Sequence, residues 1–291
     1  MGDEVLVTGE ARYLQQKHGS ERKVLVVDQS GAPRWHVLWE GNPRIFRPKQ
    51  IGYVRGSKGG RAVYKRPDDP VIELRNAAGF RPYVDWDRMR REFVALCPSQ
   101  PFTTKPDKLL HLLGPEGIKN VPWRFTGYPA RRGELFLKRR ERHGHAIIEP
   151  FNKPVSPNRD WGWQRYQAVV DATPSVSWMQ INPEGSRLLR KVRHEPAATF
   201  AVACEILSGA SLYLGPEGGL YHAAAALGIP AVAIFGGYIP LSQGYDDMTN
   251  FYEDMDGDSP CGQRVPCAHC QKAMELITVE RVVEAVERMR A

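Results

Sequence analysis

Long apolar segments are absent from this chain of 291 residues, where no run approaches the roughly 18 apolar residues that a membrane-spanning helix needs. The N-terminus also lacks the basic stretch followed by an apolar stretch that is typical of a signal peptide. These absences argue against a helical membrane protein and against a secreted one. We therefore expect a cytoplasmic protein, with peripheral contact as the one form of membrane association left open.

Cysteine is scarce, and three of the five cysteines, Cys261, Cys267 and Cys270, lie in one short segment. This usage is unlike the framework of a disulfide-rich secreted protein. Cys267 and Cys270 form a Cys-x-x-Cys motif, which raises the question of zinc. A closed zinc site needs four ligands, and His269, between the two cysteines, would join them only through a strained loop. We therefore expect reduced thiols packed in a loop and no metal cofactor, with structural zinc as the alternative.

Basic residues outnumber acidic ones, with 40 Lys and Arg against 33 Asp and Glu, a formal net charge of +7 and a pI near 9.2. This excess favours an anionic partner without saying which one. The densest basic segment covers residues 131–145. It is either a solvated surface near a domain boundary or the lip of a cleft that attracts a phosphorylated acceptor.

The most informative segment runs from Leu207 to Gly237 and predicts a strand, a glycine turn, a helix and a second strand. A glycine pair, Gly218-Gly219, precedes the alanine-rich helix. It leaves backbone N–H groups unobstructed at the positive end of the helix dipole, where a diphosphate is stabilised without a metal. His222, one turn into the helix, is expected to point toward the same place.

The same segment resembles the C-terminal signature of glycosyltransferase family 9, the bacterial heptosyltransferases. In that signature a strand leads to Asp-x-Gly-x-x-His, an alanine-rich helix, Gly-x-Pro and a strand ending in Phe-Gly. The matching positions here are Glu217, Gly219, His222, residues 223–226, Gly228, Pro230 and Phe235-Gly236. Glu217 departs from the family's aspartate by one methylene. The resemblance implies that a nucleotide-sugar donor binds at Glu217, Gly218, Gly219, His222, Gly236 and Gly237.

Two further segments extend the resemblance. The family places a Gly-Asp dipeptide after its first strand, and here Gly2-Asp3 stands at the chain start without such a strand. The match implies that Asp3 is the catalytic base, whereas the alternative is a frayed residue that caps the first helix. Near the start of the second domain, the family's loop before a Trp contacts the donor phosphates. That match implies donor contacts for Arg159, with Lys153 and Ser156 in the same loop.

Hydrophobic patterning predicts helices over residues 4–18, 86–96 and 278–289 and strands over residues 23–28, 71–74 and 146–149. The stretch 98–122 is expected to be broken by its prolines. At 32.8 kDa the chain is large enough for two cores. With the resemblance, we expect an α/β protein of the GT-B class, whose two Rossmann-like domains, 1–140 and 141–291, face each other across a cleft, the first lacking its usual first strand.

The resemblance implies an inverting, metal-independent transfer of a sugar from a nucleotide sugar to an acceptor hydroxyl. The family's default acceptor is a lipopolysaccharide core or related glycan. One alternative is a transferase acting on a modified base in nucleic acid, because the basic N-terminal half carries Trp35, Trp39 and Trp86, which suit a nucleic-acid partner. The other is a non-catalytic protein that binds nucleotide sugars or nucleic acid.

Overall fold

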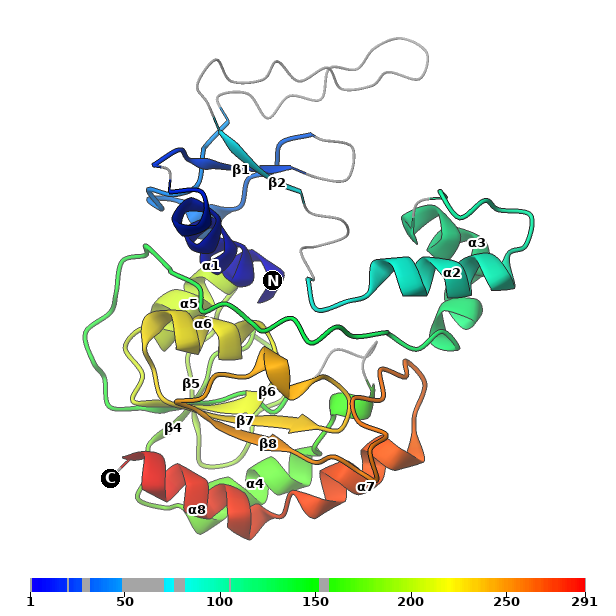
Figure 1. Ribbon diagram of the computed structural model, residues 1–291. Helices are drawn as coiled ribbons and strands as arrows, with labels where there is room; N and C mark the ends of the chain where they lie inside the picture. Colours follow the sequence, from blue (N-terminus) through cyan, green and yellow to red (C-terminus); the bar gives the residue numbers. More distant parts are fainter. Residues whose placement is uncertain are drawn as a thin grey trace. The chain divides into compact units, whose positions relative to one another are not determined.

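The computed structural model describes residues 2–19, 21–27, 32–48, 71–75, 82–104, 106–151 and 157–290. The chain divides into two compact units (Figure 1). The first contains residues up to 81 and the returning segment 131–138, and the second contains residues 82–130 and 139–291. The expected division at residue 140 lies close to the last of these boundaries. The compact units differ from it because residues 82–130 group with the second unit.

The first unit is built on one helix and two parallel strands. Helix α1 (Gly2–Lys17) buries residues 5–11, and strand β1 (Val24–Val27) is fully buried. Strand β2 (Ile72–Arg75) pairs with β1 in register from Val24↔Ile72 to Val27↔Arg75. The described residues of this unit form a two-stranded sheet rather than a full Rossmann sheet.

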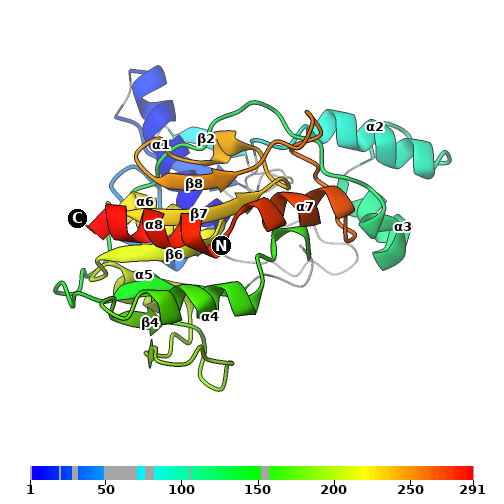
Figure 2. The same cartoon turned by 90° about the horizontal axis from the view of Figure 1, so that it is seen from below.

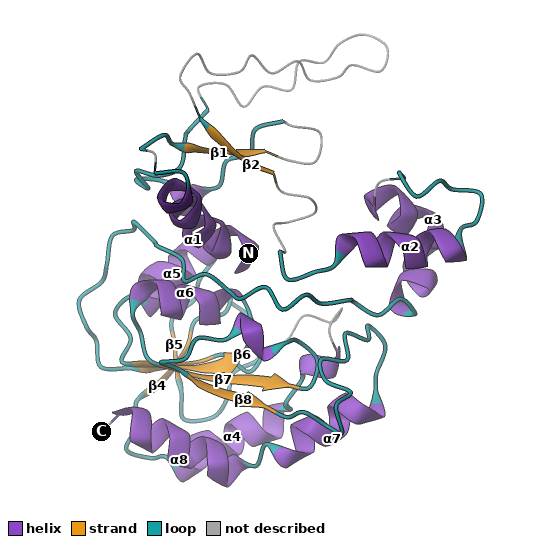
Figure 3. Ribbon diagram, viewed as in Figure 1, coloured by secondary structure: helices purple, strands orange, loops and turns teal. Residues whose placement is uncertain are grey.

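The second unit contains a six-stranded sheet in which every neighbouring pair is parallel (Figure 3). Its strand order, β5-β4-β3-β6-β7-β8, is the order 3-2-1-4-5-6 of a Rossmann fold. The strands are β3 (Ala146–Ile148), β4 (Trp178–Gln180), β5 (Arg193–His194), β6 (Leu212–Pro216), β7 (Ala231–Gly236) and β8 (Thr249–Tyr252). The central strands are buried along their whole length, which explains their continuous apolar sequence.

Helices cover both faces of this sheet, as Figures 1 and 2 show. The helices α5 (Phe200–Leu207) and α6 (Gly219–Leu227) lie on one face, and α4 (Trp163–Ala172) and α8 (Val279–Arg290) on the other. A core cluster of buried residues joins α4 and α8 to the sheet and includes Trp161 and Tyr166. Helix α6 ends at Gly228, whose φ of 72° is the left-handed conformation that favours glycine.

Residues 82–130 add two helices to the second unit. Helix α2 (Trp86–Leu96) has the predicted bounds, and the Asp85 side chain caps it by accepting from the Arg88 N–H. Helix α3 (Pro106–Lys119) lies in the stretch that was expected to be broken, and that expectation is wrong in part. Its break is a local kink, with Gly114 at φ 65° before Pro115, so helix continues on both sides. Met89, Phe93 and Leu109 form a small core between the two helices.

Three further short helices, η1 (Val37–Trp39), η2 (Pro157–Arg159) and η3 (Leu241–Gln243), and helix α7 (Ala268–Leu276) complete the described elements. Among the residues that the structure describes, no helix is both long enough and apolar enough to cross a membrane.

Candidate functional site

The order of the strands in the second unit reverses between β3 and β6. In sheets of this kind, ligands bind outside the carboxyl ends of the strands at that point. Strand β3 ends at Ile148 and is followed by Glu149, while β6 ends at Pro216 and is followed by Glu217. These two carboxylates therefore mark the place where a site is expected.

The start of α6 lies directly after Glu217 and is open. Gly218 is the N-cap of the helix and provides no side-chain hydrogen bond to it. Between Leu212 and Ala225, Gly218 and Gly219 are the two residues that are not buried. A Cβ on Gly218 would have Pro216 O, at 3.9 Å, as its nearest neighbour. The first amides of α6 therefore lie at the surface, where they can bind an anion.

Arg159, the last residue of η2, brings a cation to the same place. Its Nη2 donates to the main-chain oxygen and to Oε2 of Glu217. The pair is mostly buried, with side-chain exposures of 18% for Arg159 and 5% for Glu217. Burial lowers the pKa of Arg159, an effect opposed by the nearby Tyr238, yet a guanidinium keeps its charge in proteins. We call Arg159, Glu217, Gly218 and Gly219 the donor site, after the role that the family resemblance implies for them.

His222 lies behind the donor site rather than in it. Its side chain is buried, and Nε2 lies 3.0 Å from Glu217 Oε1 while Nδ1 lies 2.9 Å from the Tyr245 hydroxyl. Because a carboxylate only accepts, Nε2 donates to Glu217, and a neutral ring then accepts the Tyr245 proton at Nδ1. Both ring nitrogens of His222 are thus engaged within the protein, and a direct contact with a bound phosphate stays a prediction.

Tyr221 and Tyr245 continue this buried network, which the sequence did not reveal. The Tyr221 hydroxyl donates to Asn250 Oδ1 at 2.7 Å and accepts the Tyr245 N–H at 3.0 Å. Asn250 in turn donates to Tyr245 O at 2.9 Å. Tyr245 follows η3 and Asn250 lies in β8, so no local pattern links them to α6.

Glu149 is a second residue that the sequence analysis missed. The Tyr213 hydroxyl donates to its Oε2 at 2.5 Å. Burial, followed by the charge of Glu149, raises the pKa of Tyr213 well above its ordinary value, so Tyr213 stays a neutral donor. Its position in the sequence could have identified Glu149 as a site residue, because it is a carboxylate directly after a buried strand.

Gly236 and Gly237, the remaining glycines of the expected donor set, have structural reasons to be glycine. Gly236 has a φ of 60°, and a Cβ there would lie 2.5 Å from Met274 Cε. A Cβ on Gly237 would lie 2.7 Å from Ser259 Oγ and 3.0 Å from His269 Cε1. Both positions therefore make room for the segment that follows β8, and a contact with the donor stays a prediction.

Three other expected residues lie in the first unit or outside the described residues. Asp3 lies in the first turn of α1, in the first unit, and is partly exposed. Lys153 and Ser156 lie outside the described residues. Of the expected set, the structure therefore brings together Arg159, Glu217 and His222 with the two glycines at the start of α6.

A second group of functional side chains lies after β8. The ligand atoms of Cys261, Cys267, His269 and Cys270 lie within 4.8 Å of one another, and we call this group the Cys/His cluster. His269 and Cys270 occupy the first turn of α7, so the strained loop expected for His269 is not required. A hydrogen bond with Cys270 lowers the pKa of Cys261 to about 5. The cluster could hold a metal ion. The strained loop was the reason for expecting no metal, and that reason no longer applies.

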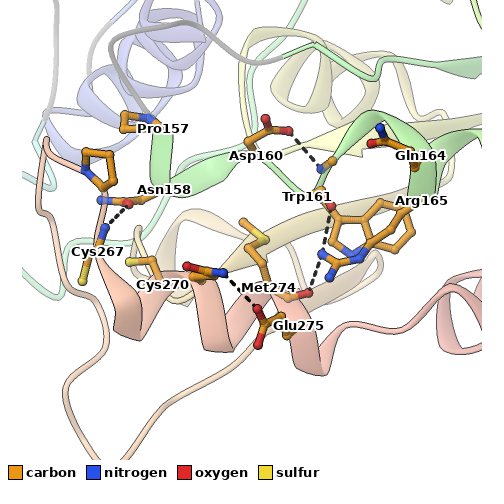
Figure 4. A pocket seen from close by; sticks show the side chains of 13 residues that line it. Pro157, Asn158, Asp160, Trp161, Gln164, Arg165, Cys267, Cys270, Met274 and Glu275 are labelled. Atoms are coloured by element: carbon orange, nitrogen blue, oxygen red, sulfur yellow. Dashed lines mark hydrogen bonds between the residues drawn. The ribbon is translucent and has the colours of Figure 1, made fainter.

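A cavity of about 490 Å³ adjoins this cluster (Figure 4). Cys267 and Cys270 lie in its wall, together with Asn158 of η2 and Arg165 of α4. Figure 4 shows the main chain of Cys267 hydrogen-bonded to Asn158 across one end of the cavity. The Cys/His cluster is therefore connected to the segment that presents Arg159.

Two solved structures are similar to the chain over 99% of its length. One is the iron-containing dodecameric glycosyltransferase TibC from enterotoxigenic E. coli H10407, with 16% identity, 73% of that chain covered and a TM-score of 0.56. The other is a glycosyl transferase family 9 protein from Veillonella parvula DSM 2008, with 13% identity, 94% of that chain covered and a TM-score of 0.51. A TibC complex with ADP-D-beta-D-heptose is also similar, with 17% identity, 78% and 61% of the chains covered and a TM-score of 0.45.

No protein-family model and no curated protein sequence matches the chain. At these low identities the structural similarity concerns the fold. The chain has the mixed α/β fold with parallel sheets of the GT-B glycosyltransferases, and its neighbours include the heptosyltransferase-like family 9. The resemblance found in the segment from Leu207 to Gly237 is confirmed at this level.

Proposed function

We propose that the chain is a glycosyltransferase that moves a sugar from a nucleotide sugar to an acceptor hydroxyl. The observation that carries the proposal is Arg159, held by Glu217 beside the uncapped start of α6. A buried guanidinium and free helix amides in one place suit the diphosphate of a nucleotide sugar. The fold shared with family 9 supports the same function, and ADP-heptose, named for a TibC complex, is the first donor to test.

The proposed transfer is a single inverting displacement. Asp3 takes the proton from the acceptor hydroxyl while the oxygen attacks the anomeric carbon. The bond from that carbon to the diphosphate oxygen breaks, and its electron pair leaves with the diphosphate. The oxygen attacks from the face opposite the leaving diphosphate, so the configuration at the anomeric carbon inverts.

Charge on the leaving diphosphate is stabilised by the protein in this proposal. Arg159 and the α6 amides supply a fixed positive potential, and Lys153 is proposed to add a further cation. His222 holds Glu217, which in turn holds Arg159 in place. A divalent ion on the phosphates is then unnecessary. An ion in the Cys/His cluster, whose thiolate and imidazole groups fit a transition metal, would stabilise the fold instead.

The proposed acceptor is anionic, and a lipopolysaccharide core or related glycan is the first choice. Transfer to a glycan, transfer to nucleic acid and nucleotide-sugar binding without transfer are three distinct outcomes of one assay. Incubating the protein with radiolabelled ADP-heptose and each acceptor class distinguishes them.

The donor site is tested by calorimetric titration of the full chain with ADP-heptose and ADP. Arg159→Ala removes charge-assisted hydrogen bonds of about 1.5–3 kcal/mol, so we expect affinity to fall about 10- to 150-fold. Gly219→Val places a branched side chain over the first amides of α6 and is expected to abolish binding. Unchanged affinity in folded forms of both variants would contradict the assignment.

A matched control is Arg190→Ala. Arg190 pairs with Asp171 on the surface of the same unit, and its side chain is 78% exposed. Removing an exposed pair costs at most about 1 kcal/mol, and nucleotide affinity is expected to stay the same. Arg159→Lys serves as a second donor-site variant, because it keeps the charge and loses the fork of donors.

A further inference from the structure

The Cys/His cluster has the spacing of a tetrahedral metal site. Cys261 Sγ and Cys267 Sγ lie 3.6 Å apart, and Cys270 Sγ lies 3.8 Å from His269 Nδ1. Metal–sulfur bonds of about 2.3 Å in a tetrahedron place two sulfurs about 3.8 Å apart. Three thiolates and one imidazole suit zinc or iron, and they do not suit magnesium or calcium.

The hydrogen bonds around His269 select the tautomer that binds a metal. Ser259 Oγ donates to the main-chain oxygen of Glu253 at 3.0 Å, and His269 Nε2 lies 3.2 Å from the same Oγ. Because the hydroxyl proton is directed at Glu253, Nε2 carries the proton that Ser259 accepts. The lone pair is then on Nδ1, the nitrogen nearest Cys270. A second partner that orients a histidine in this way is typical of metal ligands.

Asn158, in η2, forms hydrogen bonds with the loop between Cys261 and Cys267. Its Nδ2 donates to Gln263 O at 2.6 Å and Val265 O at 2.8 Å, and its Oδ1 accepts the Cys267 N–H at 2.9 Å. The residue is buried, with 6% exposure. The next residue in the chain is Arg159, which reaches Glu217. One side chain thus joins the Cys/His cluster to the cation of the donor site.

We propose that Cys261, Cys267, His269 and Cys270 bind one zinc or iron ion, and that Asn158 couples this ion to the position of Arg159. The ion closes the loop that carries the three partners of Asn158. A closed loop holds Asn158, and Asn158 holds the end of η2 from which Arg159 extends. Asn158 is a positioning residue, and its role in donor binding rests on the proposed function.

The metal part is tested by elemental analysis of the purified full chain. We expect about one zinc or iron per chain. Cys261→Ser combined with Cys267→Ser should lose the ion, whereas Cys97→Ser, at the end of α2 and outside the cluster, should retain it. Cobalt(II) added to the metal-stripped chain should give the absorption of tetrahedral thiolate coordination. A purified chain without metal that also binds neither zinc nor cobalt would overturn the proposal, whatever the donor site does.

The coupling is tested by hydrogen exchange and nucleotide titration together. Asn158→Ala should keep the metal, speed amide exchange in segments 157–162 and 262–267, and weaken ADP binding about 5- to 150-fold, the range typical of coupled sites. Removing the metal from the native chain should likewise speed amide exchange in these two segments and weaken ADP binding. In Asn158→Ala, removing the metal should change exchange and ADP affinity little further. Asn158→Asp, which keeps the acceptor for the Cys267 N–H, should have a smaller effect.

Asn120→Ala is the control, because Asn120 is exposed and its side chain donates to the nearby Glu116 O at 3.0 Å. A metal-loaded Asn158→Ala with native exchange in both segments would overturn the coupling. If the native chain binds no nucleotide, the proposed function fails, while metal content and exchange still decide this inference.

Discussion

The two units hold their central elements in different ways. In the second unit, the donor site lies next to the carboxyl end of a strand in a six-stranded parallel sheet, and both faces of the sheet are covered by helices. In the first unit, the described residues supply two strands, and α1 depends on the returning segment 131–138. The regular sheet thus lies where a ligand is expected to bind, while in the first unit α1 is held by a segment far away in the sequence.

The contacts on α1 are close and partly polar. The Glu134 N–H donates to Thr8 Oγ1 at 2.7 Å, and the Arg12 side chain pairs with Glu134 at 2.8 Å. Gly9 lets the main chain of residues 131–132 approach the helix. The basic segment 131–145 is therefore partly engaged in structure, since Arg131 pairs with Glu10 at 2.9 Å and lies over the Tyr13 ring. Its use as the lip of a cleft stays a prediction.

The largest expected effect is the loss of turnover when Asp3 of the first unit is replaced. If Asp3 is the base and the second unit holds the donor, Asp3→Asn should lower turnover by about 100- to 10,000-fold and leave ADP affinity nearly unchanged. Initial rates of sugar transfer and calorimetry on the same samples measure the two quantities. Equal losses in both would show that Asp3 serves the structure of α1, and unchanged turnover would place the base elsewhere, with Glu10 the next carboxylate to test.

The substitution Gly9→Ala is expected to disrupt the packing of α1. A Cβ at Gly9 would lie 2.6 Å from Arg131 O and 2.7 Å from Arg132 O. Alanine gains about 1 kcal/mol in helix propensity, but backbone oxygens cannot rotate away, and overpacking costs about 1–3 kcal/mol. We expect Gly9→Ala to lower the free energy of unfolding of the first unit by up to about 2 kcal/mol and to speed amide exchange in α1.

Gly127→Ala is the control for this variant, because a Cβ at Gly127 meets nothing within 4 Å. Stability should be unchanged there. A Gly9→Ala protein as stable as the native one, with native exchange in α1, would show that the returning segment moves away freely and does not hold the helix.

Local signals explain which parts of the fold the sequence predicts. The unit β6-α6-β7 follows from apolar strands, a glycine pair and the Gly228 and Pro230 stop, all within one segment. Strands β4 and β5 have three and two residues, too few for a periodic pattern, and pairing with distant neighbours defines them. Helix α3 was missed because the sequence cannot show that Gly114 and Pro115 only kink the chain.

The site divides in the same way. The motif residues Glu217, Gly218 and Gly219 were predicted, because their chemistry depends on neighbours along the chain. Arg159 was also predicted, from the resemblance of its loop. Its pairing with Glu217 and the bond between Asn158 and Cys267 were not predicted, since these pairs are 58 and 109 residues apart. The bond between His222 and Tyr245 was not foreseen for a related reason, because a helix position gives the direction of a side chain but does not show which distant residue it meets.

A smaller effect is expected within the buried network behind the donor site. Tyr245→Phe removes the hydroxyl that lies 2.9 Å from His222 Nδ1, a hydrogen bond that contributes about 0.5–1.5 kcal/mol. Urea denaturation should show this loss, with only a small fall in ADP affinity because Glu217 keeps its bond to Arg159. Tyr13→Phe is the control for loss of a tyrosine hydroxyl, because Tyr13 lies in the first unit and its ring face beneath Arg131 is retained. A larger loss of affinity than of stability would place His222 in direct contact with the donor.

The smallest expected effect is that of brief chelation. Arg159 and the α6 amides supply the charge for the leaving diphosphate in the proposed mechanism, so initial rates measured within minutes of adding EDTA should equal those of the untreated protein. Activity that disappears at once and returns with magnesium or manganese would contradict this, and it would direct attention to Asp254 and Asp256, which are exposed in the turn after β8. A slow decline that follows the loss of metal from the Cys/His cluster has another meaning. It would show that the second unit supports its donor site through a stabilising ion as well as through its sheet, because Asn158 then loses the closed loop that holds it.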